Sequence, residues 1–125
     1  MKSTVFFRVD GGNVYSIAMG HVYRCLKLAE YMREEYNISS LFIMKDYPAG
    51  VQKITGWGFE VEVLSCECSL ATDFNTTYEL VSEATLVIDV RHFNTNQIEL
   101  FRSRTNKLIQ FDDFGGKEYR PHVLI

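Results

Sequence analysis

Short runs of β-branched and aromatic residues alternate along the chain with segments in which apolar residues recur at helical spacing. The clearest helical segment is 20–36, where Val22, Cys25 and Ala29 share one face and charged residues occupy the other. Strands separated by helices are joined by right-handed crossovers, which produce a parallel sheet with helices on both faces. Strands are expected at residues 4–9, 40–44, 60–64, 85–89 and 107–111, and helices at residues 20–36, 49–55, 75–83 and 96–104.

This alternation predicts a Rossmann-like α/β fold, and the length of 125 residues fits a single domain. The last three residues, Val123, Leu124 and Ile125, resemble the opening of another strand. A free-standing domain seldom ends inside an apolar element. We therefore expect a further domain or a separate partner chain to complete the protein.

Charge and composition exclude several classes of function. The net charge of −3 provides no basic face for a nucleic-acid backbone. The longest apolar runs, such as 85–88, are far too short to span a membrane, and no signal peptide is recognisable. Three cysteines form neither a disulfide framework nor a zinc motif. These features favour a cytoplasmic protein with reduced thiols, and Cys25 is expected to pack in the core.

Polar residues that follow the strands are the first candidates for a functional site, because ligands of open parallel sheets bind beyond the carboxyl ends of the strands. Three segments qualify: residues 10–21, 89–92 and 112–116.

The first of these segments leads into the helix that begins at Gly20, with His21 and Arg24 in its first turns. Unpaired amide groups at a helix N-terminus suit an anion, and the same dipole disfavours an imidazolium. His21 is therefore a candidate general base. In the alternative interpretation, the glycines only permit tight turns, His21 is a surface cap and Arg24 pairs with Asp10. The segment matches neither the dinucleotide fingerprint nor a P-loop.

Taken in order, the motifs resemble one known family. Arg8-Val9-Asp10, the run from Met19 to Ala29 with its Gly-His-x-x-Arg-Cys core, Asp89, and the pair Asp112-Asp113 look like the N-terminal domain of the UDP-sugar hydrolases of pseudaminic-acid synthesis, a pattern that spore-coat polysaccharide proteins share.

The resemblance implies the first half of a two-domain glycosyltransferase-B fold that acts in surface-polysaccharide synthesis. It implies that His21 activates water, which attacks the anomeric carbon of a UDP-linked 6-deoxy diacetamido sugar and releases UDP. No metal or other cofactor is implied. A C-terminal domain would supply most contacts to the nucleotide, so this chain alone is expected to have negligible activity. Substrate-binding roles are implied for Asp10, Gly11, Gly20, Arg24, Asp89 and Asp113.

Two positions differ from the family pattern. Ala18 replaces the first motif glycine, and Arg91 stands where the family has an aromatic residue. They motivate two alternatives, a glycosyltransferase of the same fold and a non-catalytic module for nucleotide-sugar binding or assembly.

Other polar residues allow more than one interpretation. Asp112 and Asp113 could bind magnesium, but adjacent carboxylates rarely chelate one ion, so a strand-end or turn role is preferred. Asp89 with His92 could form a second acid–base pair or only anchor a loop. Trp57 is expected to be a hydrophobic anchor at a turn rather than a platform for a sugar.

Overall fold

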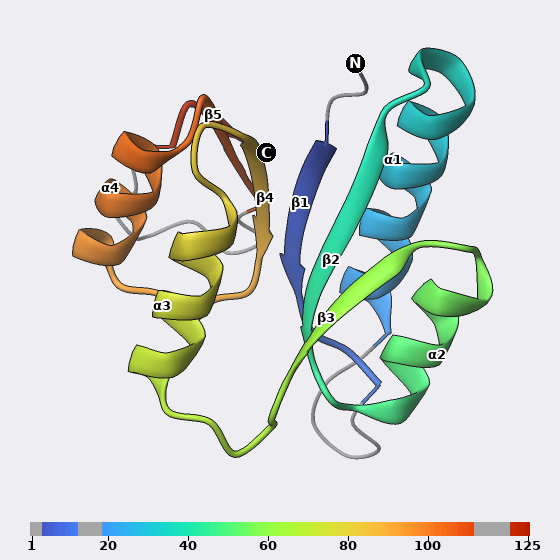
Figure 1. Ribbon diagram of the computed structural model, residues 1–125, viewed down its shortest axis with the longest axis horizontal. Helices are drawn as coiled ribbons and strands as arrows, with labels where there is room; N and C mark the ends of the chain where they lie inside the picture. The colour runs from blue at the N-terminus through green and yellow to red at the C-terminus, as the bar shows by residue number, and fades with distance from the viewer. Residues whose placement is uncertain (1–3, 13–18, 112–120) are drawn as a thin grey trace.

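The computed structural model describes residues 4–12, 19–111 and 121–125. Its centre is a six-stranded sheet in the order β3-β2-β1-β4-β5-β6, and every neighbouring pair is parallel (Figure 1). The expected α/β, Rossmann-like fold is therefore confirmed. The strands are β1 (Thr4–Val9), β2 (Ser39–Lys45), β3 (Glu60–Leu64), β4 (Thr85–Asp89), β5 (Lys107–Gln110) and β6 (Val123–Leu124), and the helices are α1 (Gly20–Tyr36), α2 (Pro48–Gly56), α3 (Leu70–Leu80) and α4 (Thr95–Arg104).

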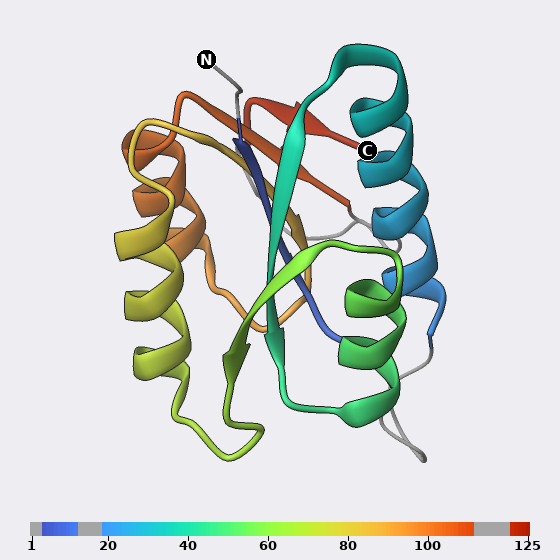
Figure 2. The same cartoon turned by 45° about the vertical axis from the view of Figure 1, so that its right-hand side comes forward.

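Two helices cover each face of the sheet. Helices α1 and α2 lie on one face and α3 and α4 on the other (Figures 1 and 2). Because side chains alternate along a strand, β1 sends Phe7 and Val9 to the α1 face and Phe6 and Arg8 to the α3 face.

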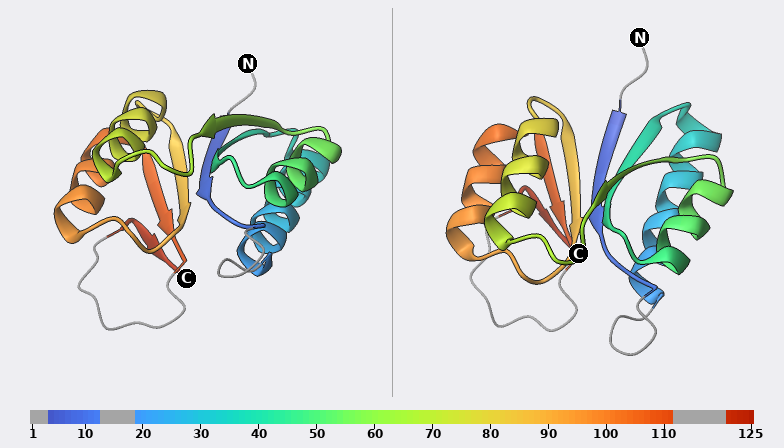
Figure 3. Two further views of the ribbon diagram at one scale, coloured as in Figure 1. Left: turned by 90° about the horizontal axis from the view of Figure 1, so that it is seen from below. Right: turned by 60° about the horizontal axis from the view of Figure 1, so that its bottom comes forward.

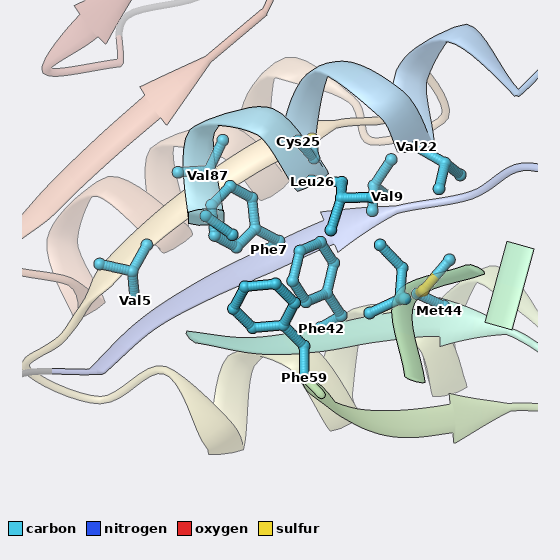
Figure 4. Close-up of a cluster of buried hydrophobic side chains, with 12 residues drawn as sticks. Val5, Phe7, Val9, Val22, Cys25, Leu26, Phe42, Met44, Phe59 and Val87 are labelled. Carbon is cyan, nitrogen blue, oxygen red and sulfur yellow. The ribbon is translucent and has the colours of Figure 1, made fainter. Parts of the chain in front are cut away.

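The core on the α1 face is built around a stack of aromatic rings. The rings of Phe7 and Phe42 are nearly parallel, with centroids 4.7 Å apart, and Phe59 packs against Phe42 (Figure 4). Cys25 is fully buried in the same cluster, as expected from its position on the apolar stripe. Val22, Leu26 and Ala29 of α1 are buried in this cluster too, which holds the helix against β1 and β2 and so positions its N-terminus.

The strand ends differ from the sequence-based expectation by at most one residue, but α3 is displaced. It was expected at residues 75–83 and spans Leu70–Leu80. The physical reason is the side chain of Ser69, which caps the helix by accepting a hydrogen bond from the amide of Thr72. The earlier start brings Asp73 onto the buried side of α3.

From β1 the chain adds β2 and β3 on one side of the sheet, and then returns to add β4, β5 and β6 on the other side of β1. The switch point therefore lies between the neighbouring strands β1 and β4. In doubly wound sheets ligands bind at this switch point, outside the carboxyl ends of the strands. Figure 3 shows this edge from below, with α1 and α2 on one side and α3 and α4 on the other. None of the helices in the described part of the chain has the length and apolar character that a membrane crossing requires.

Candidate active site

His21, on the first turn of α1, faces the carboxylate at the end of β4. The distance from His21 Nδ1 to Asp89 Oδ1 is 2.9 Å, and the side chains are 35% and 2% exposed, respectively. An ionised carboxylate can only accept a hydrogen bond, so this contact requires the proton on Nδ1. In the neutral ring, Nε2 then carries the lone pair that a general base uses.

Arg24, one turn further along α1, binds the same carboxylate through two nitrogens. Its Nε donates to Asp89 Oδ2 at 2.6 Å, and its Nη2 donates to Oδ1. The guanidinium also lies over the ring of Phe111 and 3.1 Å from His21 Nδ1. Nη2 has a second N–H that could point to Nδ1, but an unprotonated Nδ1 would leave the 2.9 Å contact with Asp89 without a hydrogen, so we assign the proton between His21 and Asp89 to the ring nitrogen. We refer to His21, Arg24 and Asp89 as the His21 cluster.

The alternative in which Arg24 pairs with Asp10 is wrong, because the side chain of Asp89 points to the α1 face. In β4, Val87 belongs to the core on this face, and a two-residue period places Asp89 on the same side. The Cys25 thiol also donates to Asp89 Oδ2, at 3.5 Å. Burial, and then the charge of Asp89, raises the pKa of this thiol well above its ordinary range, so Cys25 is an inert donor.

Asp10 belongs to a second polar cluster on the α3 face, centred on the fully buried guanidinium of Arg8. Arg8 contacts Asp10 at 2.7 and 3.0 Å and Asp73 at 2.9 and 2.7 Å, through two nitrogen–oxygen pairs in each case. The Asp10 carboxylate also accepts the amide of Lys45 at 2.8 Å. This Arg8 cluster, comprising Arg8, Asp10 and Asp73, ties the ends of β1 and β2 to α3.

Burial alone would lower the pKa of Arg8, but the bonds to Asp73 and the charge of Asp10 raise it above its ordinary value. Burial alone would also raise the pKa of Asp73, but the Arg8 guanidinium and the nearby His92 ring hold it well below its usual range. Arg8 and Asp73 therefore carry their charges at neutral pH, as a buried ion pair requires.

The lowered pKa of Asp73 predicts a specific loss of stability in acid. A carboxyl group whose pKa is lower in the folded state stabilises that state above its ordinary pKa, and this contribution disappears as the pH falls. The difference in free energy of unfolding between the wild type and Asp73→Asn should be full at neutral pH and shrink from about pH 5 downward. Urea unfolding across this range measures it, and a difference independent of pH would contradict the account.

The loop after β1 is fitted closely against the first turn of α2. Gly12 has a φ of 92°, and a Cβ added there would lie 2.3 Å from the amide nitrogen of Gly50. A Cβ on Gly50 would lie 2.1 Å from the carbonyl oxygen of Gly11. Gly11, for which a substrate-binding role was expected, therefore also packs closely against α2 through its backbone. Around Gly20, in contrast, a Cβ would meet nothing within 4 Å.

We expect Gly50→Ala to destabilise the domain by about 1–3 kcal/mol, because backbone on both sides must shift to admit the methyl group. Gly56→Ala is the matched control in the same helix, since a Cβ there meets nothing within 4 Å. The control should be neutral or up to about 1 kcal/mol more stable than the wild type. Thermal unfolding of the two variants compares them directly. If Gly50→Ala is as stable as Gly56→Ala, the contact between Gly11 and Gly50 does not constrain the loop after β1, and the prediction is wrong.

The structure joins some of the expected site residues and separates others. His21, Arg24 and Asp89 meet, and Asp10 and Gly11 lie on the neighbouring strand end. Asp89 and His92 do not form the second acid–base pair considered from the sequence, because Asp89 binds α1. Asp113 and Ala18, together with Asp112, lie outside the described residues.

Sequence reasoning missed Asp73 and the role of Arg8 as its partner. Two signals were available: an arginine inside an otherwise apolar strand, and an aspartate on the inward stripe of a helix. Trp57 is 48% exposed, so it is only partly the buried anchor that was expected. No group of three or more potential metal ligands occurs among the residues that the structure describes.

A search against protein-family models, curated proteins and solved structures found no match to this chain.

Proposed function

We propose that this domain carries the water-activating half of an enzyme that hydrolyses a nucleotide-activated sugar, with His21 as the general base. The observation that carries the proposal is the contact of His21 Nδ1 with the buried carboxylate of Asp89. A carboxylate in this position holds an imidazole in one tautomer and orients it, and it stabilises the imidazolium that forms when the base takes a proton.

Positive charge already surrounds His21. Asp89 already has a guanidinium partner in Arg24, so its charge does not require a second cation. The helix dipole also disfavours an imidazolium at the N-terminus of α1, a helix of 17 residues with no acidic residue in its first turn. A neutral imidazole can accept a proton from water at physiological pH.

The same helix end suits an anionic leaving group. The N-cap of α1, Met19, makes no side-chain hydrogen bond, so no side chain of the cap satisfies the first amides of the helix. Amides of this kind can bind a phosphate group. A substrate that pairs an electrophilic sugar carbon with a diphosphate uses both features, and a UDP-linked 6-deoxy diacetamido sugar is the candidate that the sequence resemblance suggests.

Hydrolysis in ¹⁸O-labelled water tests this proposal. The complete native protein, with any further domain or partner it carries, is incubated with UDP-linked diacetamido sugars, and the products are analysed by mass spectrometry. We expect the label on the anomeric carbon of the released sugar and none on UDP. Label on UDP would place the attack at phosphorus, and transfer of the sugar without label would identify a glycosyltransferase. Binding without turnover would leave only the non-catalytic module.

A further inference from the structure

A second imidazole lies beside the other buried carboxylate. His92, in the loop between β4 and α4, has its Nε2 2.9 Å from Asp73 Oδ2, and its side chain is 31% exposed. The distance is that of an ion pair, although the ring nitrogen is not aligned for a hydrogen bond. The ring packs on Phe93 with centroids 4.5 Å apart, which limits its rotation.

The two imidazoles occupy related positions around the switch point. His21 meets Asp89 on the α1 face, and His92 meets Asp73 on the α3 face. Each carboxylate is 2% exposed and is bound through two nitrogens by an arginine, Arg24 for Asp89 and Arg8 for Asp73. Both imidazole side chains remain about one third exposed, so each can meet a ligand at this edge.

The two pairs differ in their charge balance. In the His21 cluster one guanidinium faces one carboxylate, whereas in the Arg8 cluster one guanidinium faces two. Lys45 lies beside the Arg8 cluster and binds Asp10 through its backbone amide. The ring of His92 is a further group that meets this cluster, at Asp73. A histidine beside a buried carboxylate on each side of one site is an arrangement that can supply both a base and an acid.

We propose that His92 is the proton donor of this site and that Asp73 is its positioning residue. This inference rests on the hydrolase proposed above. Nε2 of His92 lies 2.9 Å from Asp73 Oδ2, so we assign Nδ1, the other ring nitrogen, to the ligand. The ligand group is a phosphate oxygen of the departing nucleoside diphosphate.

In the proposed reaction His21, on the α1 face, takes up one proton and His92, on the α3 face, gives up one. His21 Nε2 takes a proton from water as the water oxygen bonds to the anomeric carbon. The bond from that carbon to the phosphate oxygen breaks, its electron pair stays on the oxygen, and this oxygen accepts the proton from His92 Nδ1. Release of a proton from His21 to solvent and uptake of one by His92 restore the starting state.

Binding of inorganic diphosphate to the chain tests the ligand contact without any need for turnover. The chain has three histidines, and their ring proton signals can be followed by NMR during the titration. We expect the signals of His21 and His92 to move. His122, whose Nδ1 accepts the amide of Leu108 between β5 and β6, is the internal control and should not move. His92→Gln should weaken diphosphate binding at least fivefold, and His122→Gln should not.

The pH profile of kcat/KM in the complete enzyme tests the proton-donor role. We expect a bell-shaped profile in the wild type and loss of its alkaline limb in His92→Gln, because that limb reports the donor. An unchanged alkaline limb would overturn the inference. So would diphosphate binding that moves only the His21 signal, and in that case the hydrolase proposal stands. If both signals move but no sugar is hydrolysed, the hydrolase proposal fails and His92 remains an anion-binding residue.

Discussion

His21→Gln is expected to reduce kcat for sugar release by about 10²–10⁴-fold, the usual cost of removing a general base, while the affinity for UDP stays close to that of the wild type. Glutamine keeps a polar side chain of similar reach at the start of α1 but cannot accept a proton from water. Steady-state kinetics of the complete enzyme measure kcat, and calorimetric titration with UDP measures the affinity.

His122→Gln is the matched control for this substitution, because His122 lies immediately before β6 and contacts Leu108 rather than the His21 cluster. It should leave kcat within about twofold of the wild type, as expected for a group remote from the reaction. Turnover by His21→Gln at a rate close to that of the control would refute the assignment of His21 as the base.

Arg8→Met is expected to have the largest effect on stability, a loss of about 3–5 kcal/mol. Arg8 is the guanidinium that both Asp10 and Asp73 bind, and removing it leaves two buried carboxylates without their cation. Methionine fills much of the same volume, so the loss reports charge rather than a cavity. Urea unfolding at neutral pH measures the change.

The triple variant Arg8→Met, Asp10→Asn, Asp73→Asn separates the two contributions. Replacing a whole buried ion-pair cluster by neutral groups is far less costly than removing one partner, so the triple variant should recover much of the lost stability. If it is less stable than Arg8→Met alone, the cluster is held by packing and hydrogen bonds rather than by balanced charge.

Much of the fold follows from periodicity that the sequence shows directly. The strand runs and the apolar stripe of α1 were sufficient to predict the parallel sheet and most boundaries. The start of α3 was not predicted, since it depends on one capping hydroxyl, Ser69, ahead of a short segment without a strong apolar period.

The site was predictable as a set of positions but not as a set of contacts. His21 and Asp89 were selected because one follows a loop into a helix and the other ends a strand. Their contact spans 68 residues and depends on the register that pairs Val9 with Asp89. The close fit of Gly12 on Gly50 likewise joins segments that no local pattern connects.

The tautomer of His21 is the most direct test of the account, because a base oriented by Asp89 must carry its proton on Nδ1. ¹⁵N NMR of the imidazole rings at about pH 8, above the ordinary histidine range, distinguishes the two nitrogens. The account predicts a protonated Nδ1 and an unprotonated Nε2 in the wild type, and loss of this preference in Asp89→Asn. A proton on Nε2 of His21, or a tautomer that Asp89→Asn does not change, would contradict it.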